Sequence, residues 1–144
     1  MKSLNKILLN LDATLESQHA LDAAVFLAKS CSATIIAVNI VNKNVVTNLA
    51  RFSDKSIAEI EVALEENGWR YLYDAEEKAK NQEARIVIIQ EYGYPEQSLT
   101  QLANEYKVDM VIIGQNPQIR KDVVQGKTAE QIIEHAPCAV LIVN

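Results

Sequence analysis

The chain has few of the features that mark secreted or membrane proteins. It contains only 2 cysteines in 144 residues, and neither Cys31 nor Cys138 has a second cysteine at metal-binding spacing. Two such thiols do not make the disulfide framework of a small secreted protein. No apolar run approaches the roughly 18 residues of a membrane span. The apolar stretch near the N-terminus is broken at once by Asn10 and Asp12, unlike a signal peptide. We therefore expect a reduced, cytoplasmic protein without a membrane partner.

Basic charge is also scarce. The chain has 14 Lys and Arg against 19 Asp and Glu, which gives a net charge of −5. A nucleic-acid surface is normally basic and clustered, so we expect no nucleic-acid partner and an acidic, solvated surface. A length of 144 residues, 49% of them hydrophobic, is enough for one domain over residues 1–144 with a sizeable core.

Apolar runs and helical periodicities alternate along the chain. Short apolar runs predict five strands, at 6–12, 33–41, 84–90, 110–113 and 138–143. Apolar residues at helical spacing predict four helices between them, at about 15–30, 56–81, 95–106 and 126–136. The segment 42–54 is polar and is predicted as a connection. This alternation predicts an α/β fold with a single open five-stranded parallel sheet and helices on both faces.

The long predicted helix contains two unusual features. Gly68 lies in its middle, where glycine costs about 1 kcal/mol relative to alanine. We expect Gly68 to mark a close approach of another element or a kink. Trp69, Tyr71 and Tyr73 form an aromatic group. Because no basic groove accompanies them, we expect them in the core or at a subunit contact rather than stacking on bases.

Ligands of such sheets bind beyond the carboxyl ends of the strands, so we searched there for candidate residues. The candidates are Asp12, Ile40, Gly114, Gln115, Gly126, Lys127 and Thr128. Asp12 could accept hydrogen bonds from a ribose or a base, or it could cap the next helix. The segment from Gly126 resembles the tail of a P-loop, but Lys121 stands where that motif requires glycine. A helix start with a lysine still attracts phosphate, so a structural and a ligand role both stay open.

Catalytic motifs are missing. The chain has no G-x-S-x-G elbow, and His19 and His135 are isolated residues expected on helix surfaces. Only Asp12 could serve as a general base at the strand ends, so we expect no enzyme and no metal centre. A receiver domain would need an aspartate after the third strand, where Gln90 and Glu91 stand. A flavodoxin-like carrier would need a glycine-rich loop after the first strand, and none is present there.

Several segments together resemble the universal stress protein family over nearly the whole chain. They are LLNLDAT, IIAVNIV, Gly93, VDMVIIG and the closing IIEHAPCAVLIV. The resemblance implies a doubly wound sheet like that of adenine nucleotide alpha hydrolases, in a small cytoplasmic stress-response protein. It also implies a homodimer that pairs through the last strand.

The resemblance further implies how the candidate site compares with relatives that hold ATP or AMP. Those relatives carry the loop G-2x-G-9x-G-(S/T) after the fourth strand. Gly114 matches its first glycine, whereas Pro117 stands at the second and removes an amide donor. Gly126 matches the third with a spacing one residue short, and Lys127 takes the hydroxyl position, so that Thr128 is displaced by one. The chain is therefore more similar to the branch that lacks the motif.

Two functional hypotheses follow from these residues and the resemblance. The first is a non-enzymatic dimer that acts through unidentified protein partners or a weak ligand, with no required cofactor and no tight ATP binding. The second is an ATP or AMP sensor, with slow hydrolysis at most, in which Lys127 and Arg120 replace the lost amide contacts by charge.

Overall fold

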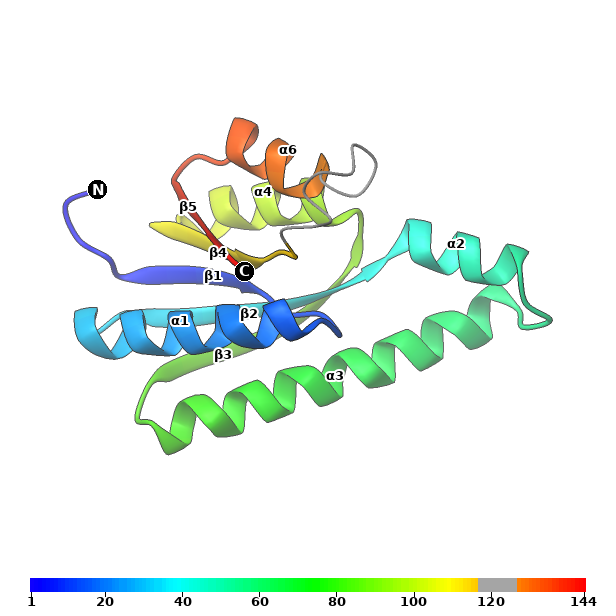
Figure 1. Ribbon diagram of the computed structural model, residues 1–144, viewed down its shortest axis with the longest axis horizontal. Coiled ribbons are helices and arrows are strands. Elements are labelled where there is room, and N and C mark those ends of the chain that lie inside the picture. Colours follow the sequence, from blue (N-terminus) through cyan, green and yellow to red (C-terminus); the bar gives the residue numbers. More distant parts are fainter. Residues whose placement is uncertain (117–126) are drawn as a thin grey trace.

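Five parallel strands form the centre of the molecule (Figure 1). The computed structural model of the chain describes residues 1–116 and 127–144. The strands are β1 (Lys6–Asn10), β2 (Thr34–Asn42), β3 (Arg85–Gly93), β4 (Met110–Gly114) and β5 (Ala139–Val143). Their order in the sheet is β3-β2-β1-β4-β5, so the order reverses between β1 and β4. The predicted single parallel sheet is confirmed.

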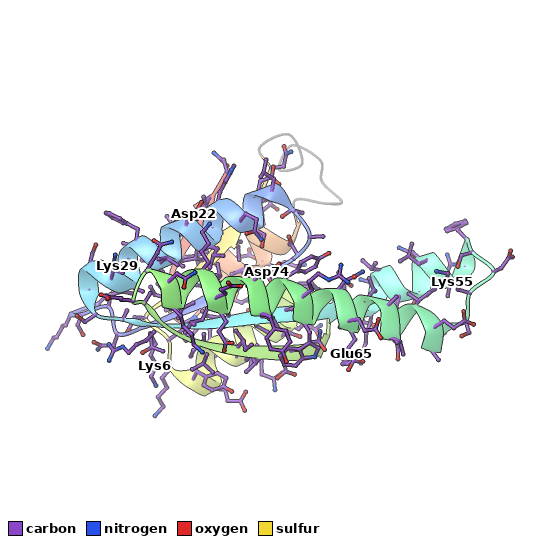
Figure 2. All side chains as sticks on the ribbon, turned by 90° about the horizontal axis from the view of Figure 1, so that it is seen from below. Lys6, Asp22, Lys29, Lys55, Glu65 and Asp74 are labelled. Carbon is purple, nitrogen blue, oxygen red and sulfur yellow. The ribbon has the colours of Figure 1, made fainter. Side chains whose placement is uncertain are left out.

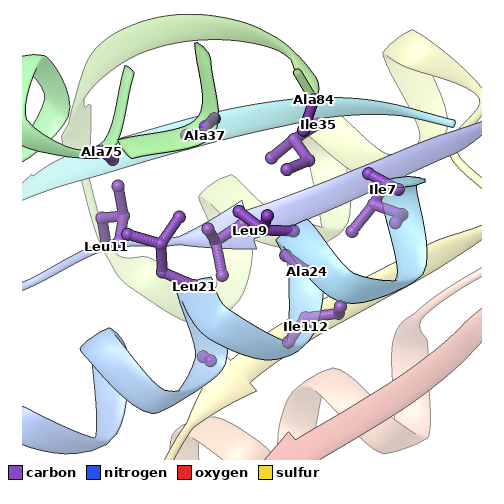
Figure 3. Packing of buried hydrophobic residues seen from close by; sticks show 14 of the residues in the cluster. Ile7, Leu9, Leu11, Leu21, Ala24, Ile35, Ala37, Ala75, Ala84 and Ile112 are labelled. Carbon is purple, nitrogen blue, oxygen red and sulfur yellow. The ribbon is translucent and has the colours of Figure 1, made fainter. Parts of the chain in front are cut away.

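Helices cover both faces of this sheet (Figure 1). On one face lie α1 (Leu15–Cys31) and α3 (Ile57–Asn81), and on the other lie α4 (Pro95–Tyr106) and α6 (Lys127–His135). Successive residues of a strand point to opposite faces, and β1 shows this clearly. Ile7 and Leu9 pack against α1 and α3, as Figure 3 shows, whereas Leu8 packs on the side of α4 and α6. All three side chains are fully buried, which explains why the strand is apolar throughout.

The segment 42–54, predicted as a connection, contains a further helix, α2 (Lys43–Arg51). The side chain of Asn42 begins this helix by accepting a hydrogen bond from the backbone N–H of Asn44, at 2.9 Å. Val46 then packs against Val41 and Ile60 in a small separate cluster. Because a nine-residue helix is marginal alone, this cluster is what stabilises α2. The sequence predicted only a polar connection here and missed this helix.

α2 and the first part of α3 project beyond the carboxyl ends of the strands (Figure 1). We call residues 43–66 the arm. Ser56 caps the start of α3, because its hydroxyl accepts a hydrogen bond from the Glu59 N–H at 3.2 Å and donates one to the Glu59 carboxylate, also at 3.2 Å. Ile57 in the first turn of α3 is 53% exposed, since the sheet does not extend under the arm.

The last helix buries one side against the sheet. Ala129 and Ile132 of α6 lie on this side and are buried. Ile133 is 55% exposed because it lies a further 100° around the helix from Ile132. Among the described residues, no helix is both long and apolar enough to cross a membrane.

Candidate functional site

Two adjoining hollows lie at the carboxyl ends of the strands. The larger has a volume of about 340 Å³ and is bordered by α2 and α3, and the smaller, of about 240 Å³, is bordered by the start of α1 and by α6. They share the lining residues Asn10, Asp12, Thr14, Asn42 and Pro95. We call the two hollows together the strand-end cleft. It lies where the strand order reverses, which is the place where ligands bind in sheets of this class.

Asp12 lies between the two hollows and organises the loop after β1. One oxygen of its carboxylate, Oδ1, accepts hydrogen bonds from the backbone N–H of Thr14, at 2.9 Å, and from the Thr14 hydroxyl. The Thr14 hydroxyl in turn accepts a hydrogen bond from the Ser17 N–H at 3.1 Å and is the N-cap of α1. Asp12 therefore supports the cap without being the cap itself. Among the described residues its other oxygen has no hydrogen-bond partner.

The larger hollow has mainly apolar walls that come from three elements. Ile40, a predicted site residue on β2, lies in one wall together with Val41. Val45 of α2 and Tyr71 of α3 complete the enclosure. Sequence reasoning missed Tyr71 as a site residue and placed it with the core or a subunit contact. Its position seven residues after Leu64, which lines the same hollow, puts both on one side of α3, but only the sheet shows what that side faces.

At the larger hollow, a buried amide, Asn39, and a half-buried one, Gln90, tie the strands to α3. Asn39, 6% exposed, donates from Nδ2 to the backbone oxygen of Leu11 at 2.9 Å. Gln90 Nε2 donates to Asn39 Oδ1 at 3.3 Å and to the backbone oxygen of Glu65 at 2.9 Å. A Cβ atom on Gly68 would lie only 2.0 Å from Asn39 Oδ1. The prediction that Gly68 marks a close approach is therefore confirmed, and the approach lets α3 form a cleft wall.

α3 also contacts the edge strand β3, through Glu65 and Tyr92. The hydroxyl of Tyr92 donates to the Glu65 carboxylate, and this hydrogen bond, with smaller effects of burial and nearby negative charge, raises the pKa of Tyr92 to about 12. The predicted aromatic group is divided between environments. Trp69 packs partly into the core and lies 5.6 Å from the Tyr73 ring, and Tyr73 is mostly exposed, whereas Tyr71 faces the cleft.

Gly114 and Gln115 lie in the smaller hollow. A Cβ atom on Gly114 would lie 2.2 Å from the backbone oxygen of Glu16, so the glycine lets the start of α1 pack against the end of β4. Gln115 Oε1 is buried and has no hydrogen-bond partner among the described residues. Leaving a buried acceptor unpaired costs about 1–3 kcal/mol. Gln115 lines the smaller hollow, but its Oε1 is covered by the surrounding protein, so a ligand reaches this acceptor only when the side chain turns.

The remaining predicted site residues are placed only in part. Gly126, together with Pro117 and Arg120, lies outside the described residues, as do the side chains of Lys127 and Thr128. The backbone of α6 begins at Lys127, and Ala129 of this helix lines the smaller hollow. A helix N-terminus carries partial positive charge, so the smaller hollow is the side of the cleft suited to an anion. The structure brings Asp12, Ile40, Gly114 and Gln115 around the cleft, and their ligand-binding roles stay predictions.

Charged and metal-binding groups are sparse in this region. Among the described side chains lining the cleft, the charged groups are the carboxylates of Asp12 and Glu16. The described part of the chain contains no cluster of three or more His, Cys, Asp or Glu that could hold a metal ion. His19 and His135 are both exposed, as predicted. His19 Nδ1 lies 3.0 Å from the backbone oxygen of Asn144 and thereby ties α1 to the end of β5.

The fold and the cleft define a doubly wound α/β protein with a ligand-sized cleft at the reversal of strand order. Comparison with known proteins then gives the family. The model of the universal stress protein family matches residues 3–144. Universal stress protein YxiE of Bacillus subtilis is 28% identical over 146 residues, which span 97% of this chain and 99% of that protein. The chain belongs to the universal stress protein family, as the sequence predicted, and this supports a role in the stress response.

Solved structures show the same fold. UspA from Lactobacillus plantarum superposes with a TM-score of 0.84 over the full length of both chains, at 19% sequence identity. A universal stress protein in complex with cAMP superposes with a TM-score of 0.72 at 20% identity, covering 99% of this chain and 98% of that one.

Proposed function

We propose that this chain is a non-enzymatic stress-response protein of the cytoplasm that senses an adenine nucleotide of low phosphate charge, of the AMP class. The strand-end cleft carries this proposal. Its larger hollow, of about 340 Å³, has apolar walls suited to a base, and Asp12 lies at the passage to the smaller hollow. The family relative solved with cAMP supports an adenine monophosphate as the ligand class.

Each part of such a ligand meets suitable chemistry in the cleft. The base fits between Ile40 and Tyr71, where it loses contact with water. The free oxygen of Asp12 accepts hydrogen bonds from ribose hydroxyls, which a ribonucleoside supplies as donors. When the Gln115 side chain turns toward the smaller hollow, its buried and unpaired Oε1 accepts a further hydrogen bond from the ligand. The phosphate lies toward the smaller hollow, near the start of α6 and Lys127.

The proposed preference for one phosphate over three rests on the sequence of the loop after β4. Pro117 stands where ATP-binding relatives have glycine, and proline has no N–H to donate to a phosphate. The carboxylates of Asp12 and Glu16 add negative charge to the walls of the cleft. A triphosphate would bring several negative charges to this site, so we propose that ATP binds more weakly than AMP and is not hydrolysed.

We further propose that the protein is a homodimer paired through β5. This strand is an edge of the sheet, and a free edge needs another chain or a covering element to satisfy its backbone. The Val143 carbonyl accepts a hydrogen bond from the Gln115 N–H on the β4 side. Because strand residues alternate in direction, the N–H groups of Val140 and Ile142 point to the open edge. A second β5 can pair with them.

Calorimetric titration of the wild-type protein with adenosine, AMP and ATP tests the ligand class. We expect AMP to bind in the micromolar range and ATP to bind about tenfold more weakly, a difference of about 1.4 kcal/mol. Lys127→Ala should weaken AMP binding and leave adenosine binding nearly unchanged. Absence of heat with adenosine and AMP up to millimolar concentration, or tighter binding of ATP than of AMP, would overturn the proposal.

A further inference from the structure

One polar side chain of the larger hollow is not used by the fold. Asn67 of α3 is half-buried and lines this hollow. Among the described residues, no hydrogen bond joins its side chain to another group. In the same part of the chain, Gln115 Oε1 is the one side-chain atom that is both buried and unpaired, so both amide atoms of Asn67 are accessible. An asparagine carries an acceptor and a donor side by side, and Asn67 presents both to whatever fills the hollow.

The turn of α3 that carries Asn67 is held against the sheet from both sides of the residue. The next residue, Gly68, lies so close to β2 that a Cβ atom on it would be 2.0 Å from Asn39 Oδ1. Two residues before Asn67, the carbonyl of Glu65 accepts a hydrogen bond from Gln90 Nε2 of β3 at 2.9 Å. Figure 2 labels Glu65 at this point of α3. The backbone at Asn67 is therefore fixed before a ligand arrives, which lowers the entropic cost of a contact with it.

A second amide without a hydrogen-bond partner among the described residues, that of Asn10, has a different place in the cleft. Asn10 borders both hollows, as Asp12 does, and so lies at the passage, where the proposed function places the ribose. Of the two hollows, Asn67 borders the larger, whose walls at Ile40 and Tyr71 are proposed to hold the base. Asn67 precedes Tyr71 by four residues, so the two side chains are neighbours on one side of α3. Asn67 is thus the free amide placed to meet the base itself.

We propose that Asn67 selects adenine over 6-oxo purines by pairing with the edge of the base. Its Oδ1 accepts a hydrogen bond from the 6-amino group, and its Nδ2 donates one to N7, which is the pairing that asparagine makes with adenine in nucleic acids. A 6-oxo purine presents two acceptors, O6 and N7, on that edge, so Oδ1 is left facing an acceptor. The inference rests on the proposed nucleotide site and adds a specificity-determining residue to it.

The apolar surroundings of Asn67 increase the penalty for the wrong base. The side chains of Ile40, Val45 and Leu64 line the same hollow and offer a mismatched base no hydrogen bond in compensation. A base that fills the hollow also displaces the water that would otherwise pair with the amide. A polar group left unpaired in such a place costs more than the hydrogen bond it fails to make, so sites of this kind reject the wrong ligand strongly.

Titration of nucleotide analogues into two proteins tests this role. The ligands are AMP, IMP, which has O6 in place of the 6-amino group, and 7-deaza-AMP, which keeps the amino group but lacks N7. In the wild type we expect IMP and 7-deaza-AMP each to bind at least about tenfold more weakly than AMP. Asn67→Leu has a side chain of similar size without donor or acceptor. We expect it to weaken AMP about tenfold and to bind the three ligands nearly equally.

A second variant and a matched control separate pairing from a change of shape. Asn67→Asp keeps an oxygen for the 6-amino group but has no donor for N7, so it should bind AMP no more tightly than 7-deaza-AMP. Asn81→Leu makes the same exchange as Asn67→Leu at an exposed residue at the end of α3, and it should keep the wild-type preference. Circular dichroism checks that each variant is folded.

The outcomes distinguish the role of Asn67 from the nucleotide site on which it rests. Wild-type protein that binds AMP, IMP and 7-deaza-AMP equally would overturn the role of Asn67 and leave the nucleotide site intact. A preference for AMP that survives in Asn67→Leu would do the same. Absence of AMP binding to the wild type would overturn the site and the role together.

Discussion

Gly114 and Gly93 both end strands, but a side chain would meet different surroundings at the two positions. At Gly114 a Cβ atom would lie 2.2 Å from the backbone oxygen of Glu16 and 2.6 Å from the backbone nitrogen of Ser17. At Gly93 the nearest atom is the hydroxyl oxygen of Ser98, also at 2.6 Å. A backbone within a helix cannot move alone, whereas a serine hydroxyl can rotate away. Gly114 is therefore required for packing, whatever its role toward a ligand.

Alanine substitution at the two glycines should separate these cases. Gly114→Ala must push the start of α1 from β4, and we expect a loss of about 3 kcal/mol in the free energy of unfolding, near the upper range for overpacked sites. Gly93→Ala should cost about 1 kcal/mol, the cost of displacing one side chain from its preferred rotamer. Urea denaturation followed by circular dichroism measures both values. Equal losses for the two variants would contradict this account of Gly114.

At the scale of residues, the sequence predicted some site positions and missed others for a physical reason. Asp12 and Gly114 could be predicted because they end apolar strands, and the carboxyl ends of parallel strands meet at one edge. Tyr71 could not, since a tyrosine beside Trp69 on a helix is equally consistent with a core position. Its place in the cleft depends on how far α3 extends past the sheet, which Gly68 and Asn39 control through three-dimensional packing.

At the scale of elements, a single carboxylate joins the starts of β1 and β4. Asp109 Oδ2 accepts hydrogen bonds from the backbone N–H groups of Asn5, at 2.8 Å, and Lys6, at 2.9 Å. The Asp109 N–H donates to the Lys6 carbonyl at 2.9 Å. The two backbone hydrogen bonds to its carboxylate lower the pKa of Asp109, because they favour the ionised form.

This lowered pKa predicts how stability depends on pH. The folded state binds the Asp109 proton less readily than the unfolded state, so the stabilisation is complete above the ordinary aspartate pKa of about 3.9. It is lost as the pH falls through the lower pKa of the folded state. Asp109→Asn should therefore be less stable than wild type at neutral pH and should lose less stability on acidification. Parallel curves of unfolding free energy against pH would contradict this role.

The two helices of the arm differ in whether the sequence could predict them. α3 could be predicted from its long apolar periodicity. α2 could not, because most of its residues are polar or charged and its helical state depends on a few distant contacts of Val46. Since short helices gain most of their stability from packing, a sequence window without its neighbours gives too weak a signal. The same isolation leaves Leu49 and Phe52 exposed.

At the scale of the whole molecule, the reversal of strand order between β1 and β4 determines where the cleft lies. The helix that follows β1 packs on one face of the sheet, and the helix that follows β4 packs on the other face. The chain therefore diverges at this point and leaves space beyond the carboxyl ends of β1 and β4. The alternation of strands and helices predicted this space in advance. The shape of the cleft could not be predicted, because α2, a helix that the sequence did not predict, lines one side of it.

The most direct test of the account is calorimetric titration of AMP into the wild-type protein and into three variants. Asp12→Asn keeps an oxygen for the Thr14 hydrogen bonds but loses the charge that faces the ligand, and Tyr71→Leu removes the ring from the wall. We expect both to weaken AMP binding at least about tenfold, or about 1.4 kcal/mol. Asp74→Asn, an exposed aspartate elsewhere on α3, should bind like the wild type. Equal affinity in all four proteins, or no binding in the wild type, would contradict a nucleotide site in the strand-end cleft.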